Sequence, residues 1–114
     1  MSGPVTEAKL WYWQRVSAMA LALFVLVHLA TMAWAVRGGL SAAEILGRTR
    51  GSWVAGAFYG VFVMAAAVHA SIGLATIAQE WLGLRAGPAR ALAAAFALAL
   101  AVLGLRAVYA LVAA

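Results

Sequence analysis

The stretch WVAGAFYGVFVMAAAVHASIGLATI, residues 53–77, decides the fold class of this chain. It contains no Asp, Glu, Lys or Arg, and it is longer than the roughly 20 residues with which a helix crosses the hydrocarbon core of a bilayer. Two further apolar runs, residues 16–36 and 91–114, flank it and carry one arginine and no lysine between them. The chain is therefore predicted to be all-α and to cross a membrane.

The composition excludes an ordinary soluble domain. Of the 114 residues, 68% are hydrophobic and 10% are charged, and the mean hydropathy is +1.01, whereas soluble domains are about 45–50% apolar. The net charge of +5 comes from basic residues that stand almost entirely between the apolar runs, so it indicates membrane-flanking charges and no nucleic-acid partner. Cysteine is absent, which excludes disulfides and thiolate ligation of metals.

The predicted architecture is an integral membrane three-helix bundle, formed by residues 1–114 as a single transmembrane domain. The spans are expected at about residues 16–36, 53–82 and 90–112. Three spans of this length leave no room for a separate catalytic domain.

A capping box in the connection after the first span predicts a short interfacial helix between spans one and two. Ser41 stands three residues before Glu44, the spacing at which each side chain bonds the backbone N–H of the other residue. Gly47 follows where a short helix is expected to end. Pro88 is well placed to open the third helix.

The tryptophans support this layout, but the basic residues leave its orientation open. Indoles prefer the membrane boundary, and all five stand near predicted span ends: Trp11, Trp13, Trp34, Trp53 and Trp81. Four basic residues flank one side of the bundle and three the other: Lys9, Arg15, Arg85 and Arg90 against Arg37, Arg48 and Arg50.

Two histidines inside the spans are the candidate ligands, because ionisable side chains in a bilayer are costly and mark functional sites. His28 lies 13 residues after Arg15, and His69 lies 12 residues before Trp81. In antiparallel spans, both imidazoles are therefore expected about 18–20 Å from the same membrane face. Neutral imidazole is an axial ligand of haem iron, and helical bundles hold haem between facing helices. The alternative is that each histidine only hydrogen-bonds a neighbouring helix.

Small residues near His69 favour the haem interpretation. Gly73 lies one helical turn further along the same face and leaves room for a porphyrin. The alternative is that small residues simply let the helices approach closely.

Polar residues at one membrane face form a candidate quinone-binding region. Arg15 and Ser17 stand at the start of the first span, and Glu80 and Trp81 at the end of the second. Such a cluster can hydrogen-bond a quinone carbonyl while apolar walls hold the tail. Polar residues at a span end also commonly do no more than anchor helices.

Other classes of function receive less support. There is no Ser/His/Asp arrangement, phosphate-binding loop or close carboxylate pair, so hydrolysis and phosphoryl transfer are not indicated. A small transporter or channel subunit stays open as an alternative, although cation transport usually needs an intramembrane carboxylate and Glu80 lies at a boundary.

The second span resembles the haem-ligating helix of the cytochrome b membrane-anchor subunits of succinate dehydrogenase and fumarate reductase. In AVHASIGLATIAQEWLG, residues 67–83, the shared pattern is His69, then Gly73 and an aliphatic residue, then an acidic residue at Glu80. In the first span, WQRVSAMALALFVLVHLATM, residues 13–32, Arg and Ser follow an aromatic lead as in the opening helix of that family.

This resemblance implies roles for individual residues. His69 would be an axial ligand of haem b, and His28 resembles the first-helix histidine of anchors that hold two haems. Arg15 and Ser17 would lie near the quinone head group. Glu80 stands where the family usually has Asp. Trp81 stands where one branch has a quinone-contacting Tyr, and an indole cannot copy a phenol.

The resemblance also implies a function and partners. The subunit would be non-catalytic alone, would hold a flavoprotein and an iron–sulfur subunit to a bacterial inner membrane, and would relay electrons between iron–sulfur clusters and quinone. Its N-terminus would be cytoplasmic. The second haem ligand is open: His28 and His69 pair within this chain, or either pairs with a histidine of another anchor or of a second copy. A haem-free structural anchor is the alternative.

Overall fold

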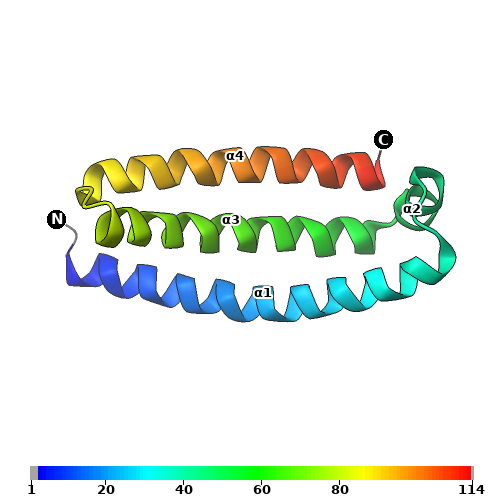
Figure 1. Cartoon of the computed structure of the whole chain (residues 1–114), viewed down its shortest axis with the longest axis horizontal. Coiled ribbons are helices and arrows are strands. Elements are labelled where there is room, and N and C mark those ends of the chain that lie inside the picture. Colours follow the sequence, from blue (N-terminus) through cyan, green and yellow to red (C-terminus); the bar gives the residue numbers. More distant parts are fainter. Residues whose placement is uncertain (1–2, 114) are drawn as a thin grey trace.

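The computed structural model describes residues 3–113 as four helices and, within that range, no strand. They are α1 (Pro4–Gly38), α2 (Ala42–Thr49), α3 (Trp53–Trp81) and α4 (Ala86–Val112). The three long helices lie side by side with α3 in the middle, and α2 crosses one end (Figure 1). Each long helix is apolar and long enough to span a bilayer. The predicted all-α three-span architecture is confirmed.

Helix α1 begins well before the apolar run that predicted it. The span was expected from about residue 16, whereas the helix starts at Pro4, which occupies the first helical turn. Proline is favoured there because its missing N–H would have no partner in any case. The aromatic lead around Trp11 and Trp13 is therefore about three helical turns rather than an irregular segment.

The short helix α2 has the predicted capping box but a different end. The Ser41 N–H donates to Glu44 Oε2 at 2.9 Å, and the Glu44 N–H donates to Ser41 Oγ at 3.2 Å. The hydrogen bond from the Ser41 backbone is the largest cause of a lowered pKa of the Glu44 carboxyl, and the bond from the Ser41 hydroxyl is the next largest.

The predicted end of α2 at Gly47 is wrong, because the helix runs on to Thr49. Thr49 Oγ1 donates to the carbonyl of Leu111 at 2.7 Å, which holds this last turn against α4. The chain then leaves the helix through Gly51, whose φ of +76° suits glycine.

Helices α3 and α4 pack closely because small side chains line their contact. The buried apolar residues are all alanines: Ala67, Ala78, Ala89 and Ala93. A Cβ added at Gly104 of α4 would overlap the side chain of Val63 on α3. Small residues at a helix crossing allow this close approach, while many of the large apolar side chains are exposed.

Pro88 was expected to open the third helix, but it lies within the first turn of α4 and not at its first residue. The helix starts at Ala86, after a turn that includes Gly83 with a φ of +69°. Proline is tolerated there for the reason given for Pro4.

Candidate functional site

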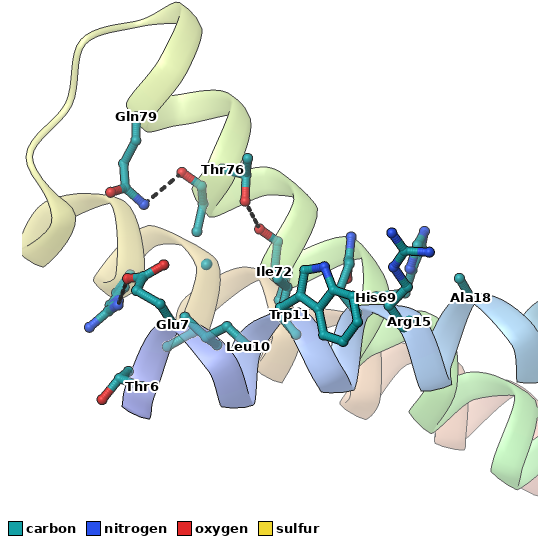
Figure 2. Close-up of a pocket in the computed structure, with 16 residues that line it drawn as sticks. Thr6, Glu7, Leu10, Trp11, Arg15, Ala18, His69, Ile72, Thr76 and Gln79 are labelled. Carbon is teal, nitrogen blue, oxygen red and sulfur yellow. Dashed lines mark hydrogen bonds and ion pairs between the residues drawn. The ribbon is translucent and has the colours of Figure 1, made fainter. Parts of the chain in front are cut away.

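A cavity of about 840 Å³ opens where the N-terminal part of α1, the C-terminal part of α3 and the start of α4 meet. Its size falls within the range of small-molecule sites. Figure 2 shows His69, Arg15 and Trp11 at one end of it and Gln79 and Glu7 at the other. Its walls also include small residues from all three helices: Ala18, Ser71, Ala75, Ala93 and Ala94.

Ser17 fixes the orientation of the His69 ring. Ser17 is buried, and its hydroxyl donates to the backbone carbonyl of Gln14 at 3.1 Å. His69 Nδ1 lies 3.4 Å from the same Oγ. Because the hydroxyl proton is already committed, Oγ acts as the acceptor for Nδ1–H, which selects that imidazole tautomer. The lone pair on Nε2 is then available to another partner.

Arg15 and Arg90 bring positive charge to the cavity. The Arg15 guanidinium lies 4.9 Å from the centroid of the Trp11 ring, a cation–π distance. Arg90 Nη2 lies 3.2 Å from Glu7 Oε1, which connects the start of α4 to the start of α1. All four side chains line the cavity.

His28 lies in a different and apolar environment. Its Nδ1 is 3.2 Å from the hydroxyl of Tyr59, and its ring meets Phe62 edge-on with centroids 5.8 Å apart. Both aromatic residues and His28 line a separate cavity of about 370 Å³, together with small and aliphatic residues of α3 and α4 such as Gly104.

The expectation that both histidines lie at equal depth is wrong. Ser17 faces His69, whereas His28 faces Tyr59, so the two contacts are ten residues apart along α3. At 1.5 Å per residue this separates the histidines by about 15 Å along the bundle. Imidazole–metal bonds are about 2 Å long, so two axial nitrogens on one iron lie about 4 Å apart. His28 and His69 of one chain therefore cannot hold the same haem.

The histidines are offset because α1 begins before the predicted span and lies displaced along α3. The sequence-based estimate placed Arg15 level with Trp81, but the contact of Ser17 with His69 puts Trp13 level with Gly73. The end of α3 then lies about 12 Å beyond Trp13.

The remaining predicted residues divide between cavity and surface. Gly73 faces α1, where an added Cβ would lie 3.5 Å from Gln14 Nε2, so it serves a helix contact rather than open space. Glu80 and Trp81 are not among the cavity-lining residues, and the Trp81 side chain is 81% exposed. Of the predicted quinone region, the structure brings Arg15 and Ser17 to the His69 site and leaves the other two residues outside.

Sequence reasoning missed Tyr59 and Arg90 as site residues. The hydroxyl of Tyr59 is an isolated polar group in an apolar run, which is the signal that could have directed attention to it. Arg90 and Glu7 are 83 positions apart in the sequence. Their contact depends on how the helices pack, so no local sequence pattern predicts it.

Comparison with known proteins gives one match. The family model of the succinate dehydrogenase/fumarate reductase transmembrane subunit matches residues 1–106, nearly the whole chain. No curated protein and no solved structure matches the chain.

Proposed function

This chain belongs to the succinate dehydrogenase/fumarate reductase transmembrane subunit family, and we propose that it is the membrane anchor of such a complex, holding haem b through His69 and passing electrons between an iron–sulfur subunit and membrane quinone. The observation that carries the proposal is the oriented His69 imidazole in a cavity that also contains Arg15.

The residues around His69 fit an axial ligand. Metal-binding histidines usually direct their second ring nitrogen to an oxygen that fixes the ring, and the contact of Nδ1 with Ser17 Oγ supplies this arrangement. Haem, when bound, supplies one-electron transfer. The chain's own part would be to orient the ring so that Nε2 is the nitrogen left for the iron.

The shape and charge of the cavity also suit a haem. Alanines of α1, α3 and α4 line part of it, beside larger apolar side chains such as Leu10 and Ile72. Arg15 provides a cation, the chemistry that pairs with carboxylates such as the haem propionates, whereas the Arg90 charge is already paired with Glu7.

The second axial ligand comes from another polypeptide in this proposal. The offset of about 15 Å between His28 and His69 removes the internal pair. A second anchor chain or a second copy of this chain would contribute the missing histidine. His28 is then free to pack against Tyr59 or to serve a separate group.

Quinone would bind at the same end of the bundle. Arg15 is the candidate donor to a quinone carbonyl, because its guanidinium lines the cavity and always carries N–H donors. Glu80 and Trp81 would lie outside the contact region, on a surface open to partner subunits or lipid.

The family is one of transmembrane subunits of larger complexes, and the chain is an integral membrane protein. Its partners in our proposal are a flavoprotein and an iron–sulfur subunit that dock on the cavity end of the bundle. That end, which includes the N-terminal part of α1, would then face the cytoplasm at a bacterial inner membrane.

A reduced-minus-oxidised optical spectrum of the purified complex tests the proposal. The wild-type complex should give a b-type signal that the His69→Ala variant loses. His28→Ala is the matched control and should keep the signal. A complex with all its subunits but no b-type signal would reject haem binding and leave a haem-free anchor. Loss of the signal in both variants would show that His28, of the same chain or of a second copy, also holds the haem.

A further inference from the structure

The end of the bundle that carries α2 has an excess of positive charge. Three arginines lie there, Arg37, Arg48 and Arg50, against one carboxylate, that of Glu44. Within residues 3–113 none of these arginines forms a salt bridge. The Glu44 carboxylate is occupied by the capping box, since its Oε2 accepts the Ser41 N–H and its side chain lies tight against Gly39. These four side chains therefore leave a net charge of +2 unbalanced among themselves.

Arg48 is held in place at the turn between α1 and α2. Its Nη2 donates to the carbonyl of Gly39 at 2.8 Å, and its guanidinium lies 5.9 Å from the centroid of the Trp34 ring. A Cβ added at Gly38 would come within 3.2 Å of Nη1. A guanidinium has five N–H donors, so this fixed group keeps donors for a further anion.

We group Arg37 with Trp34 and Arg48 as one cluster, because it adjoins the positions that Arg48 contacts at the end of α1. Residues three apart on a helix lie on the same face, so Arg37 follows Trp34 on one face of α1. Gly38, its chain neighbour, is the residue that Arg48 approaches. Arg37 is exposed, and the Trp34 side chain is 65% exposed, so both are accessible from outside the chain.

The cluster lies at the level of the lipid head groups. His28 faces Tyr59, Trp34 comes six residues after His28, and Trp53 comes six residues before Tyr59. In antiparallel helices the two indoles are therefore level, about 9 Å beyond this contact. Paired indoles at one level mark the boundary of the bilayer, where phospholipid phosphates lie.

We propose that Trp34, Arg37 and Arg48 form a binding site for the phosphate of an anionic phospholipid in the leaflet at the α2 end. The two guanidinium groups bind the phosphate oxygens, and the indole packs against the glycerol and upper acyl region. The uncompensated charge favours an anionic lipid over a zwitterionic one. This site lies at the other end of the bundle from the His69 cavity, and it does not depend on haem or quinone binding.

Quenching of tryptophan fluorescence by brominated lipid tests the site in the whole complex. The complex is placed in phosphatidylcholine vesicles that contain either brominated phosphatidylglycerol or brominated phosphatidylcholine. The difference between wild type and Trp34→Phe isolates the signal of Trp34. We expect roughly 25-fold stronger apparent binding of phosphatidylglycerol than of phosphatidylcholine, about fivefold for each of the two arginines near a membrane surface.

Three variants decide the outcome. Arg37→Gln removes an exposed charge and should abolish most of the preference, whereas Arg37→Lys keeps the charge and should retain at least part of it. Arg85→Gln removes an exposed charge from the opposite end of the bundle and should leave the preference unchanged. Equal quenching by both lipids in the wild type, or an unchanged preference in Arg37→Gln, would overturn the proposal. Relief of the quenching by inorganic phosphate alone would show a free-anion site instead of a lipid site.

Discussion

The two histidines occupy ends of the bundle that differ in polarity, although each has an oxygen partner at a similar distance. His69 Nδ1 lies 3.4 Å from Ser17 Oγ beside a large cavity with charged walls, and His28 Nδ1 lies 3.2 Å from the Tyr59 hydroxyl among aromatic rings. The Ser17 hydroxyl donates to a backbone carbonyl, whereas the Tyr59 hydroxyl contacts His28 Nδ1. A hydroxyl whose proton is used elsewhere accepts from the histidine, whereas a hydroxyl that donates to it occupies the lone pair of a ring nitrogen.

The largest loss of stability is expected at one of two glycines. Gly104 lies beside the His28 cavity, and Gly73 lies on the face of α3 that meets α1. Gly104→Val places methyl groups against Val63 and should reduce stability by about 1–3 kcal/mol, because overpacking forces neighbouring side chains to shift. Gly73→Ala adds a Cβ at an ordinary contact distance of 3.5 Å and should change stability by less than about 0.5 kcal/mol.

Thermal inactivation of the detergent-purified complex, followed by subunit dissociation, measures both glycine variants. Greater damage from Gly73→Ala than from Gly104→Val would show that the α1–α3 contact, not the α3–α4 contact, limits close packing.

Removing the oxygen partner of each histidine tests the comparison directly. Ser17→Ala should weaken haem retention about 10–100-fold, the usual cost of losing the group that orients a ligating histidine. Tyr59→Phe should leave haem retention unchanged, because Tyr59 contacts His28 instead. The rate of haem transfer to an excess of apomyoglobin reports retention. Equal rates for wild type and Ser17→Ala would reject the orienting role of Ser17.

A smaller effect is expected from the ion pair between Arg90 and Glu7. Both side chains are partly exposed, at 37% and 61%, so solvent and salt screen their attraction. Glu7→Gln should reduce stability by about 0.2–1 kcal/mol. Denaturation of the complex at low and at high salt measures this, and the difference from wild type should shrink at high salt. The control Glu80→Gln removes an exposed carboxylate outside the cavity.

The smallest effect is a local pH dependence at the α2 end. Hydrogen bonds from Ser41 hold the pKa of Glu44 below its usual value of 4.5, so the native state favours the charged form. Stabilisation of the α2 start is therefore complete above that value and is lost as the pH falls through the lowered pKa.

Amide hydrogen exchange at Ser41 measures this loss. Protection in the wild type should fall with decreasing pH, after correction for the intrinsic exchange rate, and Glu44→Gln should show no such change. An identical pH profile in both proteins would contradict the role of the carboxylate.

The elements of this fold could be predicted from local sequence signals. Long apolar runs identified the three spans, and the spacing of Ser41 and Glu44 identified the start of α2, because these signals act within one helix. Hydropathy marks where a helix becomes apolar, not where it begins, so the early start of α1 at Pro4 was missed. A proline ahead of an aromatic segment was the available signal.

The residues that meet at the site were harder to predict, because their pairing depends on the position of one helix along another. The residue types at the His69 end were identified, including Arg15 and Ser17. Their partners were assigned by counting from span ends, and a shift of α1 by about three turns changed every pairing. The offset of His28 from His69, the exclusion of Trp81 and the role of Arg90 all follow from that shift.

Two hydrogen bonds join the end of α2 and the loop after it to the end of α4, which is made later in synthesis. Thr49 Oγ1 and the Gly51 N–H donate to the carbonyls of Leu111 and Val112, and Thr49 is made 62 residues before Leu111. On the ribosome, α1 and α3 are thus complete while this loop still lacks its acceptors. These two bonds can therefore form only after α4 has been made.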